Sequence, residues 1–65
     1  MLKLSIRYRD GKLETMNESL YADWDAEWLI IRVNPTREEE FAGFRGAVRR
    51  LIPKDLIRYA WYEGD

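Results

Sequence analysis

The amino-acid sequence predicts an α+β fold: a mixed four-stranded sheet in the order strand-strand-strand-helix-strand, with one helix packed on one face. Three observations predict it. Residues 2–9 alternate strictly between apolar and polar side chains, residues 36–51 carry apolar side chains at spacings of three and four, and residues 56–63 are again aromatic and apolar. Alternation is typical of a half-buried strand, and the longer spacing is typical of an amphipathic helix.

The length and composition indicate one small domain, residues 1–65, held together by aromatic packing. The chain has three Trp, four Tyr and two Phe, but no Cys and no His. A domain near this size buries only roughly 60% of the surface that its unfolded chain exposes. Because disulfides are impossible and the usual ligands of a structural metal are missing, we expect no metal and no cofactor, and we keep oligomerisation open.

The first two strands are predicted to form a hairpin. Asp10-Gly11 suits the two central positions of a type I′ turn, and alternation resumes at Lys12. A two-residue turn would place Tyr8 opposite Leu13 and Arg7 opposite Glu14. Residues 19–26 show neither period clearly, so they are either an extension of the second strand or a short helical turn capped by Ser19.

The third strand and the helix have stronger signals. Residues 27–33 are rich in β-branched and aromatic residues, with Leu29, Ile31 and Val33 in the more apolar row. Thr36 and Glu39 have the spacing of a capping box, although Asn34 followed by a proline is a competing cap, and Pro53 ends the helix.

The predicted helix contains Gly43 and Gly46, which favour a close approach of helix to sheet; a groove for another helix is the alternative. A helix over residues 36–51 rises about 24 Å, which matches the length of its flanking strands. The last strand, residues 56–63, is therefore expected to run parallel to the third strand after a right-handed crossover.

Charge and patterning narrow the class of protein. The formal net charge is -1, from 11 basic and 12 acidic residues, so no overall field favours nucleic acid. No segment resembles a secretory signal or a membrane span, so we expect a soluble cytoplasmic protein without a membrane partner. Without His or Cys the commonest catalytic constellations are absent, and we expect no enzymatic activity and no catalytic residues.

Three alternating carboxylates, Asp23, Asp25 and Glu27, resemble the start of a calcium-binding loop. Such a loop needs Gly at its sixth position and Glu at its twelfth, and this chain has Trp28 and Asn34 there. We therefore interpret these carboxylates as a solvated acidic turn and expect no metal site.

The leading functional hypothesis is binding of another protein by aromatic anchors with neighbouring carboxylates. The candidate residues are Tyr21, Asp23, Trp24, Asp25, Glu27 and Trp28. The ordinary alternative is that Trp24 and Tyr21 close the open end of the core. Small cysteine-free proteins are often inhibitors from phages or mobile elements that occlude a host macromolecule, for instance in anti-defence roles. This inhibitor hypothesis is an analogy with proteins of similar size and composition, and it does not depend on a residue motif.

The alternative hypothesis is single-stranded nucleic-acid binding through a basic and aromatic sheet face. The candidate residues for that face are Lys3, Arg7, Arg9, Arg32, Arg58 and Tyr62. A homodimer is a further alternative, expected if Trp28 and Ile30 lie on the sheet face that the helix leaves uncovered.

Overall fold

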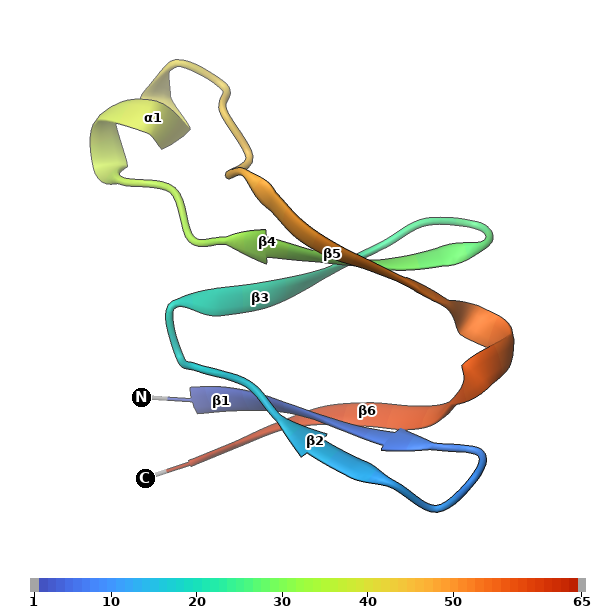
Figure 1. Ribbon diagram of the computed structural model, residues 1–65. Coiled ribbons are helices and arrows are strands. Elements are labelled where there is room, and N and C mark those ends of the chain that lie inside the picture. The colour runs from blue at the N-terminus through green and yellow to red at the C-terminus, as the bar shows by residue number, and fades with distance from the viewer. Residues whose placement is uncertain (1, 65) are drawn as a thin grey trace.

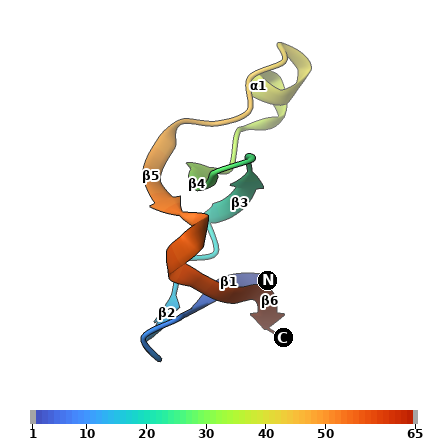
Figure 2. The same cartoon turned by 90° about the vertical axis from the view of Figure 1, so that its right-hand side faces the viewer.

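The structure is a computed structural model and describes residues 2–64. Its elements, in chain order, are β1 (Leu2–Tyr8), β2 (Leu13–Thr15), β3 (Leu20–Trp24), β4 (Trp28–Val33), α1 (Arg37–Phe41), β5 (Val48–Pro53), the 3-10 turn η1 (Lys54–Leu56) and β6 (Ile57–Gly64). The strands form two sheets, in the orders β2-β1-β6 and β3-β4-β5, which face each other in Figure 1. In Figure 2 the chain passes from β5 through η1 into β6, which joins the two sheets.

The predicted α+β fold, with one mixed four-stranded sheet and a packed helix, is wrong. Every strand pairing in residues 2–64 is antiparallel, and β6 pairs with β1 instead of running parallel to β4. Residues 2–9, 27–33 and 56–63 do contain strands, and residues 19–26, which the sequence left open, contain β3. Alternation identifies a strand, but its partner is set by contacts with residues distant in the chain.

The predicted helix over residues 36–51 begins where expected and ends ten residues early. Thr36 and Glu39 form the capping box, each side chain accepting a hydrogen bond from the backbone N–H of the other residue. Gly43 then takes a positive φ of 84° and donates to the Glu40 carbonyl, while Phe44 donates to the Glu39 carbonyl. These two bonds are the Schellman motif, so Gly43 terminates the helix.

Gly46 brings the chain back to the sheet after α1. Its φ is 101°, and a Cβ placed on it would lie 1.9 Å from the backbone oxygen of Val33. The prediction that Gly43 and Gly46 allow the helix to approach the sheet closely is wrong, because both glycines follow the helix; at Gly46 it is the segment after α1 that passes close to β4. No residue of α1 is buried, and Figure 1 shows α1 projecting beyond one end of the sheets. Neither sheet face is covered by this helix.

The β1–β2 hairpin exists, but its register differs by one residue from the predicted one. Glu14 lies opposite Ile6, and Leu13 lies opposite Arg7. Tyr8 donates its backbone N–H to the Lys12 carbonyl, so the turn has three residues and ends on a glycine with φ of 94°. A one-residue shift exchanges the two faces of a strand. Glu14 therefore faces the interior side of its sheet and Leu13 faces outward.

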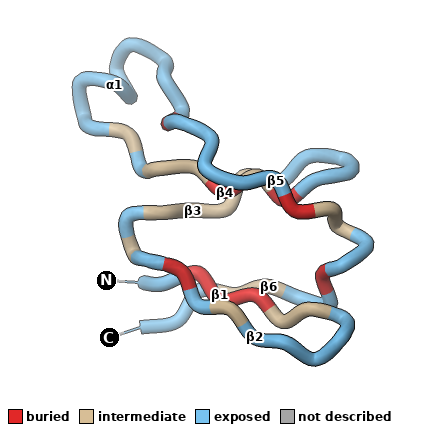
Figure 3. Tube along the Cα trace, viewed as in Figure 1, coloured by how far each residue is buried: buried red, intermediate tan, exposed pale blue. Residues whose placement is uncertain are grey.

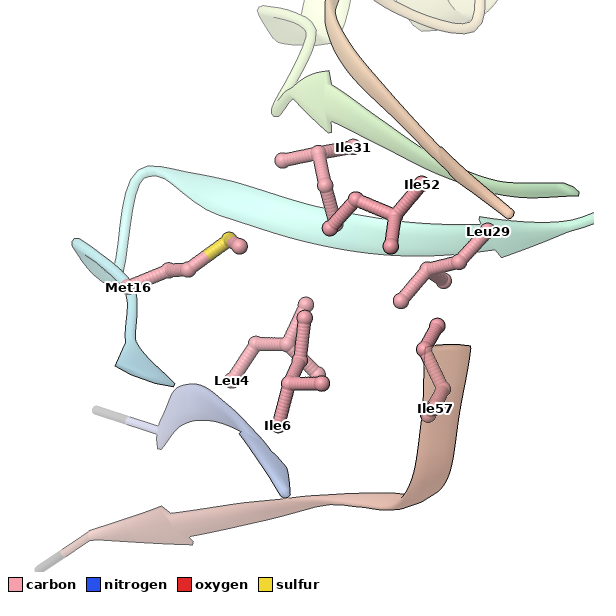
Figure 4. Close-up of a cluster of buried hydrophobic side chains, with 7 residues drawn as sticks. All are labelled: Leu4, Ile6, Met16, Leu29, Ile31, Ile52 and Ile57. Carbon is pink, nitrogen blue, oxygen red and sulfur yellow. The ribbon is translucent and has the colours of Figure 1, made fainter. Parts of the chain in front are cut away.

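The core lies between the two sheets. Figure 3 shows its buried positions in red along the facing strands, and Figure 4 shows the side chains meeting across the gap. Its members are Leu4, Ile6, Met16, Leu29, Ile31, Ile52 and Ile57. The apolar rows predicted for residues 2–9 and 27–33 thus supply most of the core. The small core leaves many large apolar side chains of this chain exposed.

Candidate functional site

The outer face of the β3-β4-β5 sheet, meaning the face turned away from the core, carries three rows of side chains. In the middle row Ile30 lies between Asp23 and Leu51, on the neighbouring strands. In the next row Trp28 lies opposite Pro53. Directly opposed residues of a sheet share a face and contact each other. The result is a continuous apolar surface that runs across β4 and β5.

The third row of this outer face is polar on β3 and β4, and the exposed Val48 of β5 lies opposite Arg32. Tyr21 lies opposite Arg32, and its hydroxyl donates to the backbone oxygen of Arg45. Arg32 also donates to the Gly46 carbonyl at 2.9 Å. These hydrogen bonds tie the segment after α1 to β3 and β4, so the polar end of the outer face is held by its own partners.

The predicted protein-binding residues form the β3–β4 hairpin, but they do not share one surface. Tyr21, Asp23 and Trp28 lie on the outer face, whereas Trp24 lies opposite Leu29 and therefore on the core side. Trp24 sits at the end of its strand and is half exposed, with the Lys54 ammonium 5.6 Å from its ring centre. The two tryptophans therefore point to opposite sides of the sheet.

The carboxylates of the hairpin have different surroundings. Asp23 accepts from Arg32 at 2.7 Å and from Arg45 at 3.0 Å, and its side chain is only 14% exposed. Asp25 and Glu27 lie in the turn between β3 and β4, where both are exposed and the Asp25 backbone N–H donates to the Trp28 carbonyl. Asp23 is thus neutralised within the chain, which leaves Asp25 and Glu27 as the candidate steering charges.

The residues of the basic and aromatic hypothesis are divided between the two sheets. Lys3 and Arg7 lie on β1, and Arg9 follows that strand, whereas Arg32 is on β4 and bound to Asp23. Arg58 is exposed on β6. Tyr62, also on β6, lies opposite Leu4 on the core side, and its hydroxyl accepts the backbone N–H of Ala22 at 2.9 Å. The described structure therefore does not gather these six residues on one open face.

The sequence patterns did not predict one cluster, formed by Arg50, Glu14 and Tyr8. Arg50 of β5 donates to the Glu14 carboxylate of β2, and the Tyr8 hydroxyl donates to the same carboxylate at 2.5 Å. The hydrogen bond from Arg50 lowers the pKa of Glu14, and burial together with the nearby carboxylate raises the pKa of Tyr8. The paired carboxylate likewise raises the pKa of Arg50. The cluster joins the edges of the two sheets.

The sequence carried a signal for this cluster in the length of the first turn. A three-residue turn ending on Gly11 places Glu14 on the same face as Ile6 and Tyr8, and a glycine in the third loop position is typical of such turns. The partner, Arg50, was assigned to a helix. Its position beside Glu14 depends on the pairing of β5 with β4, which local patterns do not reveal.

Comparison with known proteins found one similarity to report. The chain is 36% identical over 64 residues to the intermembrane lipid transfer protein VPS13 of Chaetomium thermophilum. The match covers 92% of this chain but spans about 2% of the length of that relative. No family model matches the chain, and no solved structure matches it. Within residues 2–64, the one α-helix is far too short to cross a membrane.

Proposed function

We propose that this protein is a small non-enzymatic module that binds another protein through the outer face of the β3-β4-β5 sheet. The observation that supports it is the continuous apolar surface made by Trp28, Ile30 and Leu51, with Leu51 54% exposed. Exposed apolar surfaces of this kind are typical of protein interaction sites, and Trp is enriched among the residues that contribute most to binding.

The apolar residues of the outer face are held in place by a central strand of the sheet. β4, which carries Trp28 and Ile30, is paired on both sides, so these side chains project from the best supported strand of the sheet. Asp23 and Arg32 are already paired at the margin of the surface. A partner can therefore bury the apolar side chains without supplying a charge to either residue. Because the strand is already ordered, binding costs less conformational entropy than it would for a flexible loop.

An inhibitory role of the phage or mobile-element type rests on chain size and composition alone, and it stays a hypothesis about the partner. The similarity to VPS13 does not decide this point, because intermembrane lipid transfer is the activity of a protein of which this chain matches about 2%. An inhibitory role and a role related to lipid transfer would each require a different partner for the outer face.

Site-directed crosslinking tests the proposal. A photoreactive benzoylphenylalanine replaces Trp28 in a tagged protein, which is then irradiated in extract of the native host. We expect a discrete crosslinked protein that disappears when untagged wild-type protein is added in excess. Leu51→Asp should abolish the crosslink, because a carboxylate in the apolar surface would be buried without a partner.

Leu13→Asp is the matched control. Leu13 is 51% exposed, close to the 54% of Leu51, but it lies on the other sheet and faces away from the core. A crosslink that survives Leu13→Asp and fails in Leu51→Asp supports the outer face of β3-β4-β5. A crosslink that survives both variants, or that wild-type protein does not displace, would contradict the proposal.

A second candidate function, single-stranded nucleic-acid binding, is favoured by one arrangement on the other sheet. Tyr59 and Trp61 lie on the outer side of β6 with ring centres 5.3 Å apart, and Arg7 lies opposite Tyr59. Aromatic rings stack on bases, and a guanidinium holds phosphate. Titration with labelled single-stranded DNA and RNA at two salt concentrations tests it, since such binding weakens steeply with salt.

A further inference from the structure

The free edge of β5 is a second feature that the proposed function does not use. Within residues 2–64, β5 has one strand neighbour, β4, so its other edge presents unpaired backbone donors and acceptors. Residues 48–51 are all exposed. The register of β5 shifts at Arg49, and residues 50–53 beyond it pair regularly with β4 and offer an edge of about 13 Å, which is enough for a short extended peptide to add as a further strand.

A depression of about 440 Å³ lies at this edge, between β5 and the β1–β2 hairpin. Leu51 and Leu56 supply apolar side chains to it, Lys12 and Arg50 supply cationic ones, and Asp10 and Glu14 supply anionic ones, so the preference for an acidic occupant comes from the charges of β5 outside the depression. The Arg50–Glu14 hydrogen bond joins the two walls. Side chains of an added strand would therefore find a preformed space on the side of β5 away from β4.

The charge of the β5 segment indicates the chemistry of the occupant. Residues 45–54 contain Arg45, Arg49, Arg50 and Lys54, and no acidic residue. Arg45 and Arg50 have acidic partners within the chain, whereas the ion pairs found among residues 2–64 do not include Arg49 or Lys54. An extended segment with carboxylates would supply the missing partners.

The same charges disfavour a second copy of this chain as the occupant. Antiparallel pairing of β5 with its own copy would bring Arg49 and Arg50 close to the same two arginines, and like charges directly opposite each other destabilise a sheet. Cationic residues on an edge strand are a common protection against such self-pairing.

We propose that the free edge of β5 takes up an extended acidic segment of a partner protein as an added antiparallel or parallel strand. This inference rests on the proposed function, since both need a protein partner, and it adds the chemical class of the segment and its place of binding. Backbone hydrogen bonds supply affinity, and Arg49 with Lys54 supplies the preference for carboxylates.

The test uses three capped synthetic peptides on the full chain: Glu-Val-Glu-Val-Glu-Val, the same peptide with all its backbone nitrogens methylated, and Lys-Val-Lys-Val-Lys-Val. Binding is followed by backbone amide shifts in NMR. We expect only the first peptide to bind, with the largest shifts in residues 48–53. Methylation removes the N–H donors of both peptide edges without changing the charge, so it separates strand addition from attraction of opposite charges.

Arg49→Glu should weaken binding of the acidic peptide by about tenfold, the loss of one hydrogen bond to a charged group. Arg37→Glu is the matched control, because Arg37 is an exposed arginine in α1. Equal binding of the methylated peptide, equal weakening by both variants, or binding of labelled single-stranded DNA at Arg49 in place of the peptide would overturn the inference.

The two proposals fail in different ways. If the acidic peptide does not bind but the crosslink at Trp28 still depends on Leu51, only the edge inference is lost. If the peptide binds β5 while the crosslink is independent of Leu51, the edge inference stands and the outer face of the sheet is not the interface.

Discussion

Arg50 and Glu14 come from different sheets, and their hydrogen bond joins β5 to β2 at the margin of the core. Tyr8 donates to the same carboxylate from a third strand. The cluster links the two sheets through side chains beside the depression between β5 and the β1–β2 hairpin. Both low and high pH should therefore weaken this contact and lower the stability of the protein.

Acid should weaken the protein partly through Glu14. The pKa of Glu14 lies below its ordinary value of 4.5, so its contribution to stability is present above 4.5 and is lost as pH falls through the lowered value. In Glu14→Gln that part of the pH dependence should be absent. At neutral pH the free energy of unfolding of the variant should be lower than that of the wild type by about 0.2 to 1 kcal/mol, as for a partly exposed ion pair. Urea unfolding from pH 2 to 7 checks this.

Tyr8 should act at the other end of the pH scale. Its pKa is raised above 10.0, so folding favours the neutral phenol, and this contribution is lost as pH rises through the raised value. Tyr8→Phe should remove the alkaline part of the stability loss. Identical pH profiles for Tyr8→Phe and wild type would contradict the assigned contact with Glu14.

Asp23→Asn should reduce stability by about 1 to 3 kcal/mol, because it leaves Arg32 partly buried beside an uncharged side chain. Asp25→Asn is the control: Asp25 lies in an exposed turn, and a change there should stay within about 0.5 kcal/mol. Thermal unfolding of both variants checks the difference. If Asp23→Asn were as stable as wild type but lost the Trp28 crosslink, Asp23 would be a partner contact instead.

Gly46→Ala should be among the most damaging changes to a glycine in this chain. The new Cβ would collide with the Val33 oxygen, and the positive φ adds strain. The free energy of unfolding should therefore fall by more than the roughly 1 to 2 kcal/mol that a left-handed backbone alone costs a residue with a Cβ. Gly11→Ala supplies the comparison, because its φ is similar and its surroundings are open. Equal losses in the two variants would show that the contact with Val33 relaxes at no cost.

Self-association is expected from the position of Trp28 and Ile30. Both lie on a sheet face that no element of the described chain covers. We expect the average mass in light scattering to rise above that of the monomer at high micromolar concentration, and Leu51→Asp to reverse the rise. A monomeric mass for the wild-type protein throughout would refute this expectation.

The sequence predicted local features well and the global arrangement poorly. Alternation located the strands that supply Leu4, Ile6, Leu29 and Ile31, and the capping box located the start of α1. The predicted helix is too long because Gly43 was interpreted as a helical residue that allows close packing on the sheet, although a glycine with positive φ is a common way to end a helix. Val48 and Leu51 continued the helical spacing by coincidence.

The candidate site shows the same division. Tyr21, Asp23 and Trp28 do share a surface, because they alternate within one hairpin. The neutralisation of Asp23 by Arg45 and the approach of Arg50 to Glu14 depend on segments more than 20 positions away. No local pattern encodes those contacts, since strand pairing is decided by the packing of the whole core.

The pairing of β1 with β6 also determines when the chain is able to fold. It joins positions as far apart as Leu2 and Gly64, 62 residues along the chain. During synthesis β1 emerges early and has only the three-residue β2 as a neighbour until β6 is made. Folding of the β2-β1-β6 sheet should therefore wait for β6 and proceed in milliseconds to seconds, as in other proteins dominated by distant strand pairs. Until then, the apolar side of β1 is exposed to chaperones and proteases.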